Sequence, residues 1–387
     1  MNNSIQLTSN LNDSTPAHIY YDLDILNTDL KGTKEPPNVV FNEIRNRPYL
    51  TNPQDYFCSI LRFQLDTPSL PVFIPDIEPN QVDINKTIYQ ICLTRSTFSS
   101  GVVNVMYSPT DFYNSFPSSP VGVVQENSPY YYVYNYQHFI KNINDAFETA
   151  FQALLTASGT LPTTHAPALV FNSETKRISL IADVAGYNDD ENSKIKIFIN
   201  PALQHLLDSL DFYYYGSPPL NPTVNPLSYR LRVYNRITNL LVLNPIVGTG
   251  QSWTVYVMEN EQTDISLWNP VSSIVFTSSL LPVLPTNTSN PSTLAQLSNY
   301  GNNSNVSNTL TDFEVAIDSM NGYKNTINYV PSSEYRLLDI LSNSPLNSIE
   351  ISVFWKDTKG RLNPFKLNCG CSGNIKLLFR KKAFNNL

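Results

Sequence analysis

Apolar and polar residues alternate along many short stretches of the chain. Between positions 349 and 355, Ile, Val and Trp occupy every second position, with Glu350 and Ser352 between them. This period of two is typical of a strand that buries one face. Proline-containing joints separate many such stretches, and many short strands joined by turns favour a sandwich or a jelly roll. Further candidate strands lie at 61–65, 87–93, 229–234, 240–243, 253–257, 272–277, 312–317, 335–341 and 375–379.

One region has a different period. From 136 to 157 the apolar residues recur every three or four positions, which predicts an amphipathic helix of about five turns. A shorter helix is predicted at 201–210, with Asn200 as its N-cap and Pro201 at the first helical position. Three candidate strands lie between the two helices, at 169–171, 178–181 and 195–199. These elements predict a small α+β unit.

The predicted fold class is therefore all-β, a single jelly-roll sandwich with an inserted small α+β domain. We expect the N-terminal part of the jelly roll at 1–100 and the inserted domain at 101–220. The C-terminal part of the jelly roll is expected at 221–387, ending in a basic strand or tail. The segment 286–308 is dense in Asn, Ser and Thr and is predicted to be a long exposed loop.

Composition narrows the class of protein. Only 15% of the 387 residues are charged, where about 25% is usual, so neutral polar groups cover much of the surface. The aromatic and β-branched content excludes wholesale disorder. Four cysteines make no disulfide framework, and residues 1–15 lack a signal-peptide pattern. No apolar run approaches the roughly 18 residues of a membrane span. We therefore expect a soluble protein made in the cytosol.

The charge of the chain is unevenly distributed. The net charge is −7, and the last 33 residues carry eight basic residues against one acid, so the first 354 residues carry −14. The acidic balance argues against nucleic-acid binding by the whole surface. The basic segment has two interpretations. It is an edge strand whose lysines discourage aggregation, or Arg380, Lys381 and Lys382 contact an acidic neighbour or packaged DNA.

Motifs give little support for catalysis. The four histidines form no H-E-x-x-H arrangement, and no G-x-S-x-G elbow is present. His138 lies beside the apolar stripe of the first predicted helix and is expected to be a half-buried structural imidazole. The segment 248–250 lacks the third Gly and the Lys of nucleotide-binding loops, so it is interpreted as a turn. No catalytic or cofactor-binding residue is predicted, and the chain is not expected to be an enzyme.

Two segments carry residue types that bind metals in other proteins. Cys369 and Cys371 are one residue apart, whereas zinc sites pair cysteines about two to four residues apart. Cys58 and Cys92 join them only if their strands converge. The acidic run 189–191 lacks the EF-hand spacing of a calcium site and is interpreted as a solvated turn. No metal is predicted.

Two tyrosine clusters, 130–134 and 213–215, flank the predicted insertion. Tyrosine has an apolar ring and a polar tip, so such clusters are expected at a domain junction or a subunit seam. The alternative is carbohydrate stacking, with Tyr131 and Tyr214 as the platforms.

Several strings near both ends of the chain and before position 280 carry a family likeness. They include VVFNEIR, PVFIP, LWNPVSSIVFTS, FWKD and LFRKK, within the ranges 39–45, 61–65, 71–75, 267–278, 344–357 and 378–382. The chain resembles the penton (minor capsid) proteins of virophages and polinton-like DNA viruses, although no motif matches between about 100 and 220. The resemblance implies a jelly roll, sometimes with an inserted domain. It also implies five copies at an icosahedral vertex, packed against capsomers of the major capsid protein.

The expected function is therefore structural. We expect a penton that forms homopentamers at the five-fold vertices, contacts the major capsid protein, and resides in the virion after assembly in the host cytoplasm. Packaged DNA is a further expected partner, through the C-terminal basic run, as is a host receptor. The alternative is a jelly-roll spike or lectin-like protein that binds host glycans. No cofactor is expected.

Overall fold

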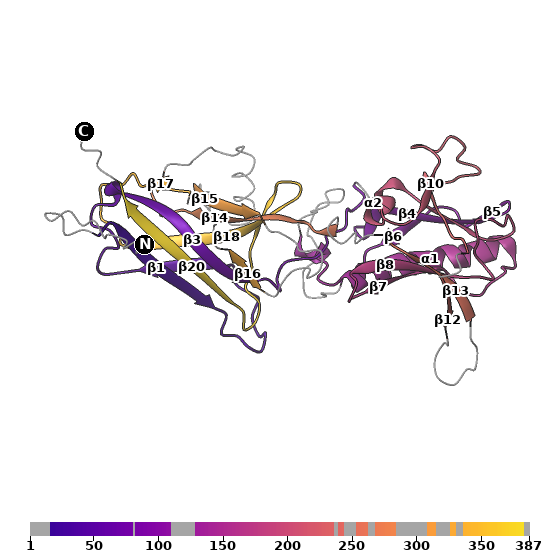
Figure 1. Ribbon diagram of the computed structural model, residues 1–387, viewed down its shortest axis with the longest axis horizontal. Coiled ribbons are helices and arrows are strands. Elements are labelled where there is room, and N and C mark those ends of the chain that lie inside the picture. The colour runs from indigo at the N-terminus through magenta and orange to yellow at the C-terminus, as the bar shows by residue number, and fades with distance from the viewer. Residues whose placement is uncertain are drawn as a thin grey trace, which may run out of the picture. The chain divides into compact units, whose positions relative to one another are not determined.

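The computed structural model describes residues 16–79, 82–109, 128–235, 239–243, 253–261, 268–283, 308–314, 326–329 and 336–382. The chain forms two compact units, coloured along the sequence in Figure 1. The jelly-roll unit comprises Met1–Leu70, Pro270–Ile317 and Tyr323–Leu387. The inserted unit comprises Pro71–Asn269 and Asp318–Gly322. The insertion therefore separates two strand-rich halves of the first unit.

The jelly-roll unit contains two antiparallel sheets. The first has the order β1 (His18–Leu26), β20 (Ser372–Lys381), β3 (Tyr56–Asp66), β16 (Thr326–Tyr329), and β17 (Leu338–Asp339) also pairs with β3. The second has the order β15 (Asn308–Glu314), β14 (Val271–Ser278), β18 (Ser348–Asp357), β19 (Leu362–Pro364), and β2 (Val40–Ile44) also pairs with β18. The short helix η1 (Pro53–Asp55) precedes β3.

The order of these strands is that of a jelly roll. Along the chain the eight principal described strands are β1, β2, β3, β14, β15, β16, β18 and β20. One sheet then holds the first, eighth, third and sixth strands, and the other holds the second, seventh, fourth and fifth. Each sheet thus combines strands from both ends of the chain, as two interleaved Greek keys require. The predicted fold class is confirmed.

The core of this unit lies between the two sheets. The alternation predicted at 349–355 is confirmed, because Ile349, Ile351, Val353 and Trp355 are all at most 1% exposed. Phe63 of β3 packs against Phe276 of β14, with ring centroids 5.0 Å apart, which joins the two sheets. Gly373 of β20 permits a close approach, since a Cβ there would lie 3.0 Å from the Leu65 side chain. Apolar burial of this kind contributes about 1.5–3 kcal/mol per large side chain.

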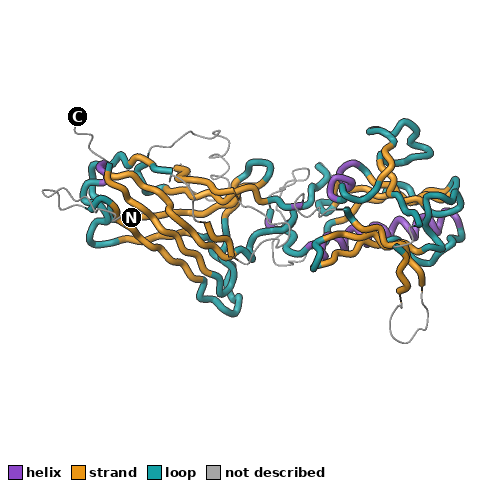
Figure 2. The backbone as a smooth tube through the Cα atoms, viewed as in Figure 1, coloured by secondary structure: helices purple, strands orange, loops and turns teal. Residues whose placement is uncertain are grey.

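The inserted unit also contains two antiparallel sheets, shown by element type in Figure 2. One has the order β10 (Phe212–Tyr214), β11 (Tyr229–Leu231), β9 (Lys196–Ile199), β4 (Lys86–Arg95), β5 (Phe98–Ser99), with β6 (Val103–Met106) also on β4. The other has the order β12 (Leu240–Leu243), β13 (Trp253–Glu259), β8 (Arg177–Asp183), β7 (Ala168–Asn172). The helices are η2 (Pro129–Tyr131), α1 (Tyr136–Ser158) and α2 (Pro201–Leu206).

Helix α1 fills the core of the inserted unit. Its apolar stripe is buried, with Phe139, Ile143 and Phe147 at 0% exposure, so the helix predicted at 136–157 is confirmed. The Asn135 side chain accepts a hydrogen bond from the Gln137 amide at the start of α1. At the other end Gly159 has φ 74°, a left-handed conformation that glycine adopts without strain.

Helix α2 begins where the sequence predicts and ends earlier. The Asn200 side chain accepts a hydrogen bond from the Leu203 amide, as expected of an N-cap, but the helix ends at Leu206 instead of 210. Asn200 also accepts from the Gln90 amide and donates to the Ile88 carbonyl, so the same side chain fixes α2 to β4.

The inserted unit is wider than the predicted range of 101–220. Strand β4 precedes that range and pairs with β9. Strands β11 and β13 follow the range; β11 pairs with β9 and β13 pairs with β8. The alternation of β4 is the same as that of a jelly-roll strand, because both bury one face. The local pattern therefore predicted the strand correctly and its unit wrongly.

Candidate interaction surfaces

The C-terminal basic run continues strand β20. This strand is not an edge strand, because β1 pairs with one side and β3 with the other, so the edge-strand interpretation is wrong. Arg380 is exposed. The Lys381 amide donates to the Ala17 carbonyl, which extends the sheet. Lys382 donates from Nζ to the Gln54 carbonyl at 2.8 Å and lies 3.0 Å from an Asp339 carboxylate oxygen.

Other basic residues of the C-terminal segment are also paired within the unit. Arg361 contacts the buried Asp357 carboxylate at 2.6 Å, and Lys376 lies 3.2 Å from Asp22. Lys366 contacts Glu35 at 2.6 Å, which lowers the pKa of that glutamate. Together with the Lys382–Asp339 pair, the contacts of Lys366 and Lys376 show that acids from distant parts of the chain neutralise three of the positive charges counted along the segment.

Tyr130, Tyr131 and Tyr132 of the first tyrosine cluster are buried, whereas Tyr134 is 44% exposed. Tyr131 has 0% exposure, and its hydroxyl donates to the Ile84 carbonyl at 2.9 Å. The Tyr130 hydroxyl donates to Asn85, and the rings of Tyr130 and Tyr131 pack edge to face. Burial raises the pKa of Tyr131 to about 12. A buried ring offers no face to a sugar, so the stacking expectation is wrong at Tyr131. The aromatic content alone does not distinguish a core cluster from an exposed one.

The second cluster begins on strand β10, and its residues Tyr213 and Tyr214 are partly exposed. Tyr214 is 60% exposed, and its ring lies 5.0 Å from that of Tyr229. Tyr213 lies between two arginines of the neighbouring chain segment, 4.7 Å from the Arg230 guanidinium and 4.6 Å from that of Arg232. Each cation–π contact of this kind contributes about 0.5–2 kcal/mol. Tyr214 therefore has the exposure that a stacking platform requires, whereas Tyr213 is occupied by cations.

The acidic run 189–191 is not a wholly solvated turn. The Asp189 side chain is only 6% exposed, with one carboxylate oxygen 3.5 Å from Arg230 Nε and 3.8 Å from Lys196 Nζ. Burial raises the pKa of Asp189, and the two cations oppose that shift. The expectation of full solvation is wrong for this residue, because the fold brings Lys196 of β9 and Arg230 of β11 to its carboxylate.

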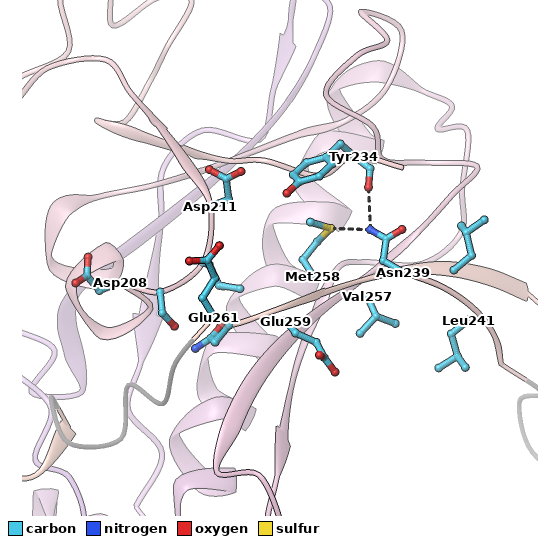
Figure 3. Close-up of a pocket in the computed structure, with 13 residues that line it drawn as sticks. Asp208, Asp211, Tyr234, Asn239, Leu241, Val257, Met258, Glu259 and Glu261 are labelled. Carbon is cyan, nitrogen blue, oxygen red and sulfur yellow. Dashed lines mark hydrogen bonds between the residues drawn. The ribbon is translucent and has the colours of Figure 1, made fainter. Parts of the chain in front are cut away.

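A groove of about 940 Å³ lies in the inserted unit (Figure 3). Its lining combines four carboxylates with apolar side chains of β12 and β13. Figure 3 shows the Asn239 amide donating to the Tyr234 carbonyl at 2.9 Å and lying 3.3 Å from Met258 Sδ. The carboxylates are Asp208, Asp211, Glu259 and Glu261, and the apolar residues include Leu240, Leu241 and Val257. The sequence analysis missed this groove, although the uninterrupted apolar run 240–243 was a signal for it.

The described residues hold no cluster of three or more His, Cys, Asp or Glu side chains that fits a metal ion. Cys58 and Cys92 are buried in different units, and burial raises the pKa of Cys58 to about 12. His138 is half-buried, as predicted, and its Nε2 contacts the Ser108 carbonyl at 2.5 Å. Burial lowers the pKa of His138. The segment 248–250 and most of 286–308 lie outside the described residues.

No helix among the described residues is long and apolar enough to cross a membrane.

Comparisons with known proteins point to one group. The family model for Sputnik minor capsid protein V18/19 matches residues 19–381. Protein V18 of Sputnik virophage, which has no assigned function, is 30% identical over 149 residues, covering 37% of this chain and 88% of that protein. Structural protein V19 of the same virophage is 27% identical over 220 residues, covering 56% of this chain and 94% of that protein.

Solved structures agree with this match. A chain in a cryo-electron microscopy structure of Sputnik virophage superposes with a TM-score of 0.74 and 25% identity, over 96% of this chain and 100% of that chain. The mavirus penton protein superposes with a TM-score of 0.62 and 17% identity, over 94% of this chain and 99% of that one. At 17% identity, the similarity to the mavirus penton protein shows a shared fold.

Proposed function

Because the chain belongs to the Sputnik minor capsid protein V18/19 family, we propose that it is a penton whose five copies form a ring at each five-fold vertex of an icosahedral capsid. The chain is a structural capsid protein of the virophage type and resides in the virion. The extent of the family match carries the proposal: residues 19–381 include nearly all described strands of both units. Assembly then takes place in the host cytoplasm, beside the major capsid protein that the ring contacts.

The surface of the jelly-roll unit supports lateral packing of copies. A cyclic ring needs a heterologous interface, in which one patch meets a different patch on the next copy. Strand β1 is an edge strand of its sheet, and three large apolar residues on it or just after it are exposed: Tyr20 at 55%, Leu26 at 59% and Leu30 at 78%. Exposed apolar residues in one region mark an interaction surface.

Electron microscopy and mass photometry of the purified protein test the ring. Five-membered rings are expected, alone or when the major capsid protein is added. Leu26→Lys is expected to reduce the ring population at least tenfold, because a charge would enter the interface. Leu220→Lys is the matched control, since Leu220 is 95% exposed in the inserted unit. A monomer at every concentration, with or without the major capsid protein, would contradict the proposal.

Contact with packaged DNA remains a separate proposal for the C-terminal run. Lys382 is already paired with Asp339, so exposed Arg380 is expected to contribute most of any contact. Genome content per particle is the measurement. Arg380→Gln should lower it more than Lys382→Gln, and equal genome content in both variants and the wild type would exclude the contact.

Glycan binding is the second candidate function, and the exposure of Tyr214 favours it. A sugar ring would stack on the free face of Tyr214 beside Tyr229. A glycan array with the wild type and Tyr214→Ala is the test. Binding that the substitution removes would support a receptor role at the vertex, and an array without signal would exclude it.

A further inference from the structure

We propose that strand β12 and the groove beside it bind an extended polypeptide segment of a separate protein, rich in Lys or Arg and in apolar residues, which adds to the sheet as a fifth strand. This partner is additional to the capsid contacts proposed above. Three features of the described part of the inserted unit support this partner: a sheet edge on which no described strand lies, apolar side chains on both faces of that edge, and a groove whose lining includes carboxylates that form no ion pair with a described residue.

The two edges of the sheet β12-β13-β8-β7 differ in protection. At the β7 edge, Asn144 of α1 accepts a hydrogen bond from the Leu169 amide at 2.7 Å and donates one to the Leu169 carbonyl at 2.9 Å. The helix therefore closes this edge with one side chain. At the β12 edge, no described strand pairs with the side that faces away from β13. Such an edge presents backbone donors and acceptors to another chain.

Side chains on β12 make the edge apolar on both faces. Leu240 and Leu241 are each 46% exposed and Val242 is 61% exposed. Successive residues of a strand point to opposite faces, so among the described residues both faces of this strand stay about half exposed. Proteins usually protect an exposed edge with Lys, Pro or a bulge, and the run Leu240–Leu243 has no charged residue and no proline.

The end of this hairpin also extends past the rest of the sheet (Figure 1). Val242 pairs with Thr254 and Leu243 with Trp253, but the pairing of β13 with β8 starts only at Val255. A two-stranded hairpin in water is marginally stable, so a third strand on its open edge would stabilise it.

The charge beside the edge selects the partner. Leu240 and Leu241 also line the groove, together with Asp208, Asp211, Glu259 and Glu261. In Figure 3, Asp208, Asp211 and Glu261 lie on the left and Leu241 on the right. Asp211 is paired with Arg232 at 2.8 Å, whereas Asp208, Glu259 and Glu261 form no ion pair with any described residue. A neighbouring segment with Lys or Arg at alternate positions would neutralise these carboxylates, and a polyanion such as DNA would be repelled.

Binding of short peptides by the full chain tests the proposal. The probe is a fluorescein-labelled peptide of four Lys-Val repeats, measured by fluorescence anisotropy in about 50 mM salt. Its Kd is expected to be at least tenfold lower than that of the corresponding Glu-Val peptide, because the groove is acidic. The same Lys-Val peptide N-methylated at every residue lacks the donors for strand addition along both of its edges and is expected to bind at least tenfold more weakly.

Two sets of variants locate the site. Leu241→Lys is expected to weaken binding of the Lys-Val peptide at least tenfold. Val170→Lys, at a residue 45% exposed on the closed β7 edge of the same sheet, should change it less than twofold. Glu259→Gln with Glu261→Gln should weaken binding severalfold and reduce its salt dependence. Circular dichroism checks that each variant is folded.

Several outcomes would overturn the proposal. These are no binding of the Lys-Val peptide, equal binding of the Glu-Val or N-methylated peptide, or no effect of Leu241→Lys. Sedimentation of the protein without peptide tests whether a second copy of the chain occupies β12 instead. A self-association that Leu241→Lys removes and Val170→Lys retains would mean that a second copy covers β12, and the proposal would then be wrong.

Discussion

Replacing Asn144 with Ala should open the edge of the inserted unit that α1 closes. The side chain forms two hydrogen bonds with Leu169, one as acceptor and one as donor. Leu169 is 1% exposed, so its backbone groups have poor access to water once the amide is removed. Each bond contributes about 0.5–1.5 kcal/mol net, so the expected loss is about 1–3 kcal/mol.

Native-state hydrogen exchange measures this loss at one residue. A loss of 1–3 kcal/mol corresponds to roughly five- to 150-fold faster exchange of the Leu169 amide, if that amide exchanges by local opening. Asn144→Asp retains an acceptor for the Leu169 amide and should protect it better than Asn144→Ala does. Gln152→Ala is the control on the same helix, because Gln152 contacts only Glu148 through its side-chain amide.

An unchanged exchange rate at Leu169 in Asn144→Ala would refute the reasoning. It would mean that water or a neighbouring group replaces the amide at no cost. The β7 edge would then be as open as the β12 edge, and the contrast between the two would lose its physical basis.

Three further substitutions test other contacts. The folded protein should lose stability below about pH 6.5 because His138 becomes protonated in the unfolded chain, and His138→Gln should remove that part of the loss. Burial lowers the folded-state pKa of His138, so the unfolded chain binds the proton first as pH falls and stability is lost; urea titrations at pH 7 and pH 5 should show a smaller difference in the variant, and an identical difference would contradict this. Trp268→Phe should cost about 1–3 kcal/mol in a denaturant titration, because the indole Nε1 of this buried residue donates to the Leu206 carbonyl at 2.8 Å. Gly373→Val should cost about 1–3 kcal/mol by the same measurement, since its side chain would press on Leu65 and Ile25 of the neighbouring strands. A variant as stable as the wild type would show that these side chains can move aside at no cost.

The sequence predicts elements well where one face of an element is buried. The stripe of α1 and the alternation of β18 follow directly from burial, and both are confirmed. The same periodicity does not predict which strands pair. Strand β4 alternates as a jelly-roll strand does, and only its pairing with β9 assigns it to the inserted unit. Periodicity is a local property, whereas pairing depends on residues about a hundred positions away.

The local sequence also does not predict which charged side chains form ion pairs. Counting along the chain gives a basic C-terminal segment, but Lys366, Lys376 and Lys382 find acids at Glu35, Asp22 and Asp339. Asp189 is the opposite case: the local sequence predicts a solvated carboxylate, but Lys196 and the distant Arg230 lie beside it in the fold. The candidate surfaces therefore could not be predicted from local sequence alone, because they depend on tertiary contacts. The uninterrupted apolar run of β12 was the clearest signal for them in the sequence.

The position of β20 between β1 and β3 has a consequence for synthesis on the ribosome. Strand β20 is an inner strand of its sheet, with His18 opposite Arg380, and it is made long after β1 and β3, so these early strands cannot pair with it until then. The inserted unit is nearly complete in the nascent chain by Asn269 and is free to fold earlier. A chain that stops before β20 would thus contain a folded inserted unit and an incomplete jelly roll that lacks an inner strand of one sheet.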